Sequence, residues 1–104
     1  MAAIPNRILF VDDDPNVLQG LRRMLSPVRH RYEFVFAAGG REALETMGAA
    51  SPFDVIITDM RMPGMDGAQL LHEVKQRHLE TVRIVLSGHS DKEMLLRVTG
   101  LAHQ

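Results

Sequence analysis

The sequence contains no cysteine and no tryptophan, and it has only one tyrosine and four phenylalanines. The absence of cysteine excludes a disulfide framework and a zinc site with cysteine ligands, and it is typical of a reducing compartment. No apolar run approaches the roughly 20 residues that cross a membrane, and the first residues lack the charged start and apolar core of a signal peptide. We therefore expect a cytoplasmic protein with no membrane partner.

The sequence also has no large excess of positively or negatively charged residues. Twelve lysines and arginines stand against thirteen acidic residues, so the formal net charge is -1. Proteins that bind nucleic acid directly usually present a strongly basic face. The arginine-rich stretch 22–31 is a candidate for such a face, but we interpret it as a solvated helix end because no aromatic residues are interleaved with it. We expect no direct contact with nucleic acid.

Short apolar runs alternate four times with amphipathic stretches along the 104 residues. The runs are typical of buried strands, and the stretches carry apolar side chains at helical spacing. The expected strands cover residues 7–11, 32–37, 53–58 and 82–86. We expect the helices to follow Asp14, Gly40, Asp66 and either Ser90 or Asp91, and the second of them to end at Gly48. This order predicts one α/β domain over residues 1–104, a doubly wound parallel sheet with helices on both faces.

Polar side chains stand at the carboxyl ends of three expected strands. Asp12 and Asp13 follow the first strand, Asp59 follows the third and Ser87 follows the fourth. In doubly wound sheets the ligand lies beyond these strand ends. Converging carboxylates repel one another, and a hard divalent cation such as Mg2+ relieves that repulsion while leaving room for a phosphate. The pattern favours phosphoryl chemistry, in which one carboxylate attacks phosphorus and a hydroxyl contacts the transferred group.

Each of these features has a simpler interpretation when it is taken alone. An acid pair after a strand is often a solvated loop or a helix cap, and we expect Asp14 to be a cap. The combination of acids after the first and third strands with a hydroxyl after the fourth is what indicates a site.

Three segments resemble the receiver domain of bacterial two-component response regulators. They are ILFVDDDP at 8–15, DVIITDMRMPGMDG at 54–67 and IVLSG at 84–88. The family pattern is an acid pair, then D-x-x-M-P-x-x-D-G, then an apolar strand that ends in Ser or Thr. The resemblance extends from Arg7 to the C-terminus in the family's order and spacing. It implies the flavodoxin-like receiver fold, with strand order 2-1-3-4-5.

The resemblance also implies a role for each residue of the site. Asp59 would accept a phosphoryl group from a phosphohistidine on a sensor histidine kinase or a phosphotransfer protein. Asp12 and Asp13 would bind Mg2+, with Asp59 and the backbone carbonyl of Arg61 as further ligands. Ser87 would move toward the phosphoryl group and relay its presence to an output domain fused to the receiver.

The sequence departs from the family pattern near its C-terminal end. Receivers continue into a fifth strand that ends in lysine and a fifth helix, whereas this chain carries only Lys75 and Lys92, on the expected third and fourth helices. We expect a C-terminally incomplete receiver without the fifth strand and helix. Its phosphorylation should be slow or absent, because the lysine stabilises the transferred group. The bare edge of the fourth strand and the uncovered sheet face predict a homo-oligomer.

The favoured function is that of a phosphoacceptor, which is not an enzyme on external substrates. Two other functions compete with it. A phosphatase with an aspartyl-phosphate intermediate would carry a second Asp two residues after the nucleophile, where Arg61 stands. A non-phosphorylatable pseudo-receiver would act as an interaction module regardless of Mg2+, and the missing lysine keeps this alternative open.

In the family, Arg61 and His89 occupy positions that tune the loss of the phosphoryl group to water. The five histidines have no zinc-site spacing.

Overall fold

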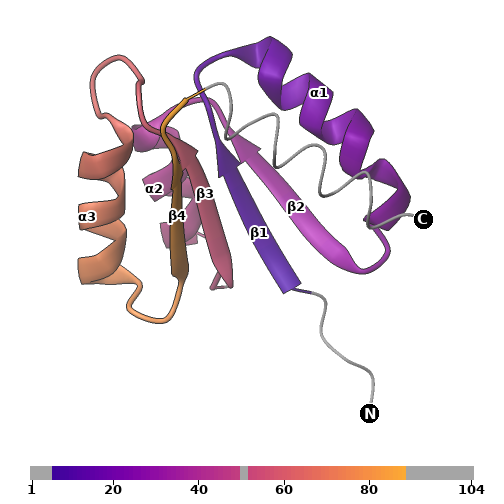
Figure 1. The fold of residues 1–104 in the computed structure, drawn as a ribbon. Coiled ribbons are helices and arrows are strands. Elements are labelled where there is room, and N and C mark those ends of the chain that lie inside the picture. The colour runs from indigo at the N-terminus through magenta and orange to yellow at the C-terminus, as the bar shows by residue number, and fades with distance from the viewer. Residues whose placement is uncertain (1–5, 50–51, 89–104) are drawn as a thin grey trace.

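Four apolar runs form one parallel sheet in the computed structural model, which describes residues 6–49 and 52–88 (Figure 1). The strands are β1 (Asn6–Val11), β2 (Tyr32–Ala37), β3 (Val55–Asp59) and β4 (Val82–Leu86). Their order in the sheet is β2-β1-β3-β4, so the winding reverses between β1 and β3. The expected flavodoxin-like doubly wound sheet is confirmed, and no fifth strand occurs within the described residues.

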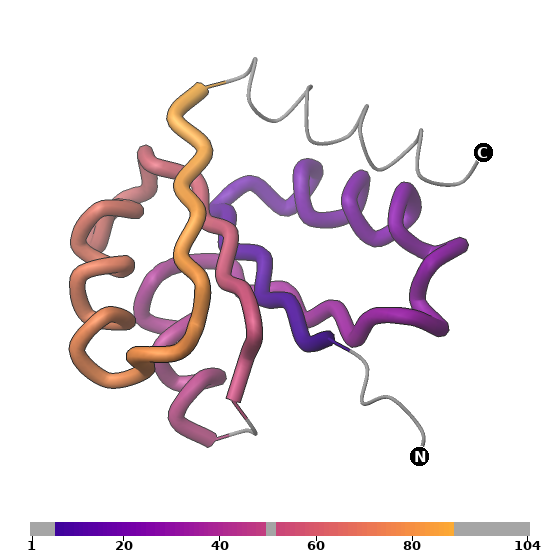
Figure 2. The backbone as a smooth tube through the Cα atoms, turned by 60° about the horizontal axis from the view of Figure 1, so that its bottom comes forward, coloured from indigo at the N-terminus to yellow at the C-terminus, as the bar shows by residue number. Residues whose placement is uncertain are grey.

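Helices cover both faces of the sheet. They are α1 (Pro15–Leu25), which continues into the short 3-10 helix η1 (Ser26–Val28), α2 (Gly40–Ala49) and α3 (Gly67–Arg77). The views in Figures 1 and 2 place α1 on one face of the sheet and both α2 and α3 on the other. None of the helices that the structure describes is long and apolar enough to cross a membrane.

The start and the end of α1 follow from its local sequence. The side chain of Asp14 accepts a hydrogen bond from the Asn16 backbone N–H at 2.9 Å, which confirms Asp14 as the helix cap. Pro15 occupies the first helical position, where a backbone N–H would form no hydrogen bond within the helix, so its absence costs nothing. The α-helix ends at Leu25, because Pro27 lacks the N–H that would continue the ladder and the chain tightens into η1.

The strands are apolar on successive residues because the sheet has a hydrophobic cluster on each face. Leu9 and Ile56 point toward α2 and α3, where they belong to the larger cluster. Phe10 and Ile57, one residue further along the same strands, pack with the α1 side chains on the opposite face. This alternation fixes the register of β1 beside β3, since a slip of one residue would exchange the two clusters.

Expected boundaries differ from the structure at β1, β3 and the end of α2, and one expected helix is not tested. The first strand begins at Asn6 and not at Arg7, and the third covers Val55–Asp59 and not 53–58, so Asp59 is its last residue. Gly48 lies inside α2, which extends to Ala49. It does not end the helix, because it lacks the positive φ of a glycine that terminates one; among the described residues only Gly64 has it. The expected fourth helix, with a cap at Ser90 or Asp91, lies outside the described residues, as does His89.

Candidate functional site

The register of β1 against β3 brings the predicted acids together. Val11 is the partner of Thr58 in this parallel pair, so the residues that follow them, Asp12 and Asp59, lie side by side at this end of the sheet. One carboxylate oxygen from each of Asp12, Asp13 and Asp59 lies within 4.8 Å of the other two. The convergence that the strand ends predicted is therefore present in the structure.

The backbone holds Asp12 in place. Its N–H donates to the carbonyl of Ala37 at 3.1 Å, which extends the β1–β2 ladder by one residue. One carboxylate oxygen accepts from the N–H of Asp14 at 2.9 Å, and the side chain is buried. Asp13 is exposed and Asp59 is half-buried. The cluster therefore has a fixed inner carboxylate and two that are open to solvent.

The donor set suits a hard divalent cation. Magnesium takes oxygen ligands at about 2.0–2.1 Å, so two ligands on opposite sides of the ion are about 4.2 Å apart. Among three ligands on an octahedral ion at least two pairs are adjacent and only about 2.9 Å apart, so the oxygens of Asp12, Asp13 and Asp59, which lie within 4.8 Å of one another, would draw closer around a bound ion. Calcium, with longer bonds, would also fit by distance, but it prefers six to eight oxygen ligands. Three carboxylates and solvent-exposed open positions match magnesium better.

The loop after Asp59 is anchored by backbone hydrogen bonds. The N–H of Met60 donates to the carbonyl of Leu86 at 3.0 Å, and the N–H of Gly67 donates to the carbonyl of Met60 at 2.8 Å. A Cβ at Gly67 would lie 2.4 Å from the Asp59 carbonyl oxygen, so only glycine permits this approach. Asp66 and Gln69 form a capping box at the start of α3. Asp66 and Gly67 therefore have structural roles in this loop.

The two remaining predicted residues lie at the same end of the sheet. Ser87 directly follows β4, whose last residue, Leu86, is the register partner of Asp59, and Ser87 is exposed. Arg61 is exposed as well and lines a hollow of about 450 Å³ with Met62 and other loop residues. Their positions are compatible with the predicted roles.

Thr58 is a site-adjacent residue that sequence reasoning did not single out. Its side chain is completely buried, and its hydroxyl donates to the carbonyl of Asp59 at 3.0 Å. It thereby restrains the backbone that carries the Asp59 carboxylate. A hydroxyl at the last buried position of an otherwise apolar strand was the available signal.

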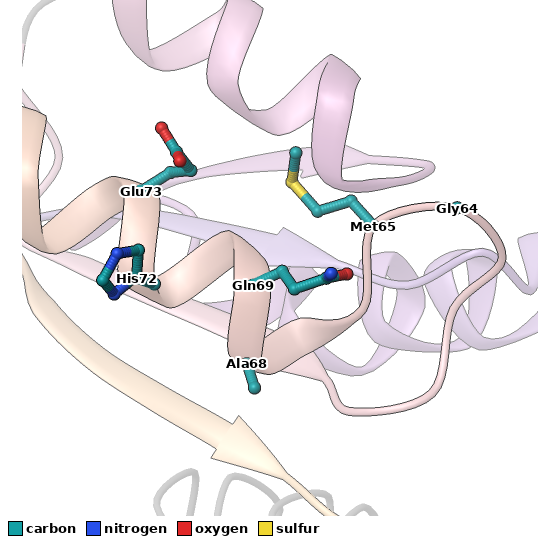
Figure 3. A pocket seen from close by; sticks show the side chains of 6 residues that line it. All are labelled: Gly64, Met65, Ala68, Gln69, His72 and Glu73. Carbon is teal, nitrogen blue, oxygen red and sulfur yellow. The ribbon is translucent and has the colours of Figure 1, made fainter.

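A hollow of about 550 Å³ beside α3 does not belong to this site (Figure 3). Met65 reaches toward α2, whereas Ala68 points away from it. Gln69 is engaged in the cap of α3, and Glu73 pairs with Arg77 at 3.2 Å. The polar side chains of Gln69 and Glu73 in this hollow therefore bind partners within α3 or its cap and do not converge on a ligand. The acid cluster remains the candidate site.

Comparison with known proteins identifies a family with this fold. The chain matches the response regulator receiver domain family over residues 8–102. It is 40% identical over 84 residues to the DNA-binding transcriptional regulator NtrC of Escherichia coli, covering 81% of this chain and 17% of the relative. It is also 40% identical over 95 residues to the regulatory protein AtoC of the same species, covering 89% of this chain and 19% of that protein. The chain thus spans less than a fifth of these relatives.

Solved structures are similar over most of this chain. The signal receiver domain of an HD domain-containing protein from Pseudomonas fluorescens has a TM-score of 0.75 and 33% identity, covering 94% of this chain and 74% of that one. The chemotaxis protein CheY4 of Vibrio cholerae has a TM-score of 0.73 and 31% identity, covering 93% and 82%. The family match includes both acid-bearing strand ends and the loop between β3 and α3. The chain belongs to the response regulator receiver domain family of two-component systems.

Proposed function

We propose that this receiver domain accepts a phosphoryl group on Asp59 from a sensor histidine kinase or a phosphotransfer protein. The observation that supports the proposal is the cluster of Asp12, Asp13 and Asp59, with carboxylate oxygens within 4.8 Å of one another at the carboxyl ends of β1 and β3. The cluster is the place where an open α/β sheet binds its ligands. It also supplies both a nucleophile and a cation site.

The transfer needs an Asp59 oxygen within reach of the donor and a reduced negative charge around it. The Asp59 carboxylate forms a bond to phosphorus, and the bond from phosphorus to the donor imidazole nitrogen breaks. The electron pair of that bond stays on the nitrogen, and the imidazole leaves neutral with the proton that its other ring nitrogen already carries. Asp12 and Asp13, with Asp59 and the backbone carbonyl of Arg61, would hold Mg2+. A bound Mg2+ would draw negative charge from the phosphoryl oxygens. The fixed position of Asp12 keeps the cluster preorganised before the donor arrives.

Ser87 is proposed to detect the phosphoryl group. It follows Leu86, which is the register partner of Asp59 and accepts a hydrogen bond from Met60. A hydroxyl that moves toward the new phosphoryl oxygens would pull on the segment after β4. An output domain in the same protein would respond to that movement. NtrC, one of the relatives, is a DNA-binding transcriptional regulator, and this chain covers 17% of it.

This assignment makes the domain a regulatory phosphoacceptor in a cytoplasmic pathway and not an enzyme on external substrates. A pseudo-receiver that serves only as an interaction module is less well supported. Three close carboxylates repel one another, and a purely structural module has no need to keep them at this distance. The two functions differ in one measurable property, which is whether Mg2+ and a phosphoryl donor modify the chain.

The test is to incubate the 104-residue chain with Mg2+ and a small acyl-phosphate donor and to follow intact mass. We expect slow addition of one phosphoryl group, in a reaction that requires Mg2+ and is absent in Asp59→Asn. The matched control is Asp54→Asn, which removes an exposed acid at the opposite end of β3. Equal labelling of Asp59→Asn and the unchanged chain would refute the proposal.

We also infer that the 104-residue chain self-associates through β4. This strand pairs with β3 alone among the described residues, and the apolar side chains of Val82 and Ile84 are 56% and 39% exposed. Leu79, just before the strand, is 76% exposed. An open apolar edge favours pairing with another chain. Sedimentation should show association that Ile84→Lys reduces and Gln76→Lys, on the exposed side of α3, does not; a monomer at high concentration would contradict this inference.

A further inference from the structure

A second recess lies at the other edge of the sheet, between the end of α1, η1 and the start of β2. We call it the α1–β2 hollow, and its volume is about 350 Å³. Its apolar part is formed by Leu25, Tyr32, Phe34 and Phe36, and Arg22 and Arg29 line it as well. The hollow begins at the amino end of β2, whereas the acid cluster follows the carboxyl ends of β1 and β3. It is therefore separate from the phosphoryl site.

The surroundings of the hollow are strongly basic in a chain whose net charge is -1. Residues 22–33 contain four arginines and one glutamate, which gives a local charge of 4 − 1 = +3 without counting His30. The glutamate, Glu33, is bound by Arg7 at 3.0 Å and is thus already neutralised. Among the described residues, none of the four arginines forms a salt bridge. The basic charge is available to an anionic partner.

The aromatic floor of the hollow is engaged in its own contacts. Phe36 stacks on Phe10 with ring centroids 5.7 Å apart, and the guanidinium of Arg22 lies over the Phe36 ring at 4.5 Å. Phe34 is packed between Phe10 and Tyr32, at 6.1 and 5.7 Å. Bases of single-stranded nucleic acid bind by stacking on free ring faces, and these rings are already in contact with one another. The floor instead offers an apolar surface to an aliphatic side chain.

The outer edge of β2 adds a third element. Within residues 6–49 and 52–88, β2 hydrogen-bonds in the sheet only with β1, so its other edge presents backbone donors and acceptors. Such an edge can accept an extended peptide as an additional strand, with main-chain hydrogen bonds for affinity and side-chain pockets for specificity. Side chains of this same strand line the hollow together with Arg22 and Arg29.

We propose that the β2 edge and the α1–β2 hollow form a docking site for an extended acidic peptide of a partner protein. The peptide backbone pairs with β2, an aliphatic side chain enters the hollow, and carboxylates on the peptide face Arg22 and Arg29. The charge of the hollow selects an acidic partner, and the occupied aromatic rings disfavour nucleic acid. This surface would allow a partner to bind independently of the phosphorylation state of Asp59.

The test uses the complete chain and a fluorescein-labelled peptide in which glutamate alternates with leucine. Fluorescence anisotropy should show saturable binding that is weakened about tenfold or more by Arg22→Glu and by Arg29→Glu. The control Lys75→Glu, with the same change of charge on the opposite face of the sheet, should bind like the unchanged chain. Arg22 also contacts Phe36, so Arg22→Glu could be unstable. Arg29 stacks on no ring of the described residues, so Arg29→Glu keeps the test valid in that case.

Hydrogen exchange distinguishes strand addition from diffuse attraction. Peptide binding should slow the exchange of backbone amides on the outer edge of β2, and a peptide with lysine in place of glutamate should neither bind nor slow them. Equal weakening by Lys75→Glu, or binding without slower exchange in β2, would overturn the proposal. Tighter binding of a single-stranded RNA at the same salt concentration, lost in the same two arginine variants, would also overturn it.

Discussion

Gly67 is the residue whose substitution should damage the fold and the acid site together. An ideal Cβ at this position would lie 2.4 Å from the Asp59 carbonyl oxygen and 2.9 Å from the Met60 Cα atom. The shorter distance is about 1 Å below the 3.4 Å at which ordinary van der Waals contact begins. Both neighbours are backbone atoms, so no side chain can rotate to relieve the clash.

The surrounding hydrogen bonds resist the required shift. The Met60 N–H donates to the Leu86 carbonyl at 3.0 Å, and the Met60 carbonyl accepts from the Gly67 N–H at 2.8 Å. Overpacking of a tight site costs about 1–3 kcal/mol, and this rigid one should cost about 2 kcal/mol in the free energy of unfolding. For a domain of this size, the loss corresponds to a fall in melting temperature of about 8 to 16 °C.

Gly20 provides the matched control for Gly67→Ala. It lies inside α1 with nothing within 4 Å of an added Cβ, so Gly20→Ala should stabilise the protein by about 0.5–1 kcal/mol. Urea unfolding followed by far-UV circular dichroism measures both changes. The Gly67 variant should also bind Mg2+ more weakly, because the clash displaces Asp59. Equal stability of the Gly67→Ala variant and the unchanged chain would refute this reasoning.

Three further substitutions separate the site from the scaffold. Asp59→Asn removes one of three repelling carboxylates, so it should stabilise the metal-free protein by about 1 kcal/mol. In thermal unfolding it should also abolish the stabilisation by Mg2+. A lower melting temperature of the metal-free variant would contradict this expectation. Asp66→Ala removes the cap shared with Gln69 and should lower the free energy of unfolding by about 1 kcal/mol. The Mg2+ affinity measured by calorimetry should not change. Weaker Mg2+ binding would show that Asp66 does more than shape the loop. Thr81→Val loses a buried hydrogen bond of 2.7 Å to the Phe53 carbonyl and should cost about 1 kcal/mol in urea unfolding, and an unchanged midpoint would contradict this estimate.

The acid cluster was predictable because it depends on features that are local in the sequence. Each apolar run ends abruptly at a polar residue, and parallel strands collect their carboxyl ends at one edge of the sheet. Asp12 and Asp59, 47 positions apart, therefore converge without any knowledge of side-chain packing. The cap at Asp14 was predictable for the same reason, since its hydrogen bond spans only two residues.

Features that depend on tertiary contact were not predictable. The stretch 22–31 contains no aromatic residue, and on that basis it was interpreted as a solvated helix end. Folding places β2 alongside it, so that Arg22 lies over Phe36 and shares a hollow with Tyr32. In the same way, nothing local to Gly67 indicates that the Asp59 backbone passes 2.4 Å from where its Cβ would be. Gly48 was assigned to a helix end by residue type alone, although its backbone stays helical.

The most direct test of the central claim is to locate the phosphoryl group after reaction with an acyl-phosphate donor and Mg2+. Borohydride reduces an aspartyl phosphate to homoserine, and peptide mass spectrometry then identifies the modified position. We predict conversion at Asp59 alone, dependent on Mg2+ and lost in Asp12→Asn, because the inner carboxylate of the cluster holds the cation. Conversion at Asp12 or Asp13 in place of Asp59, or no Mg2+-dependent conversion in the chain, would contradict the account.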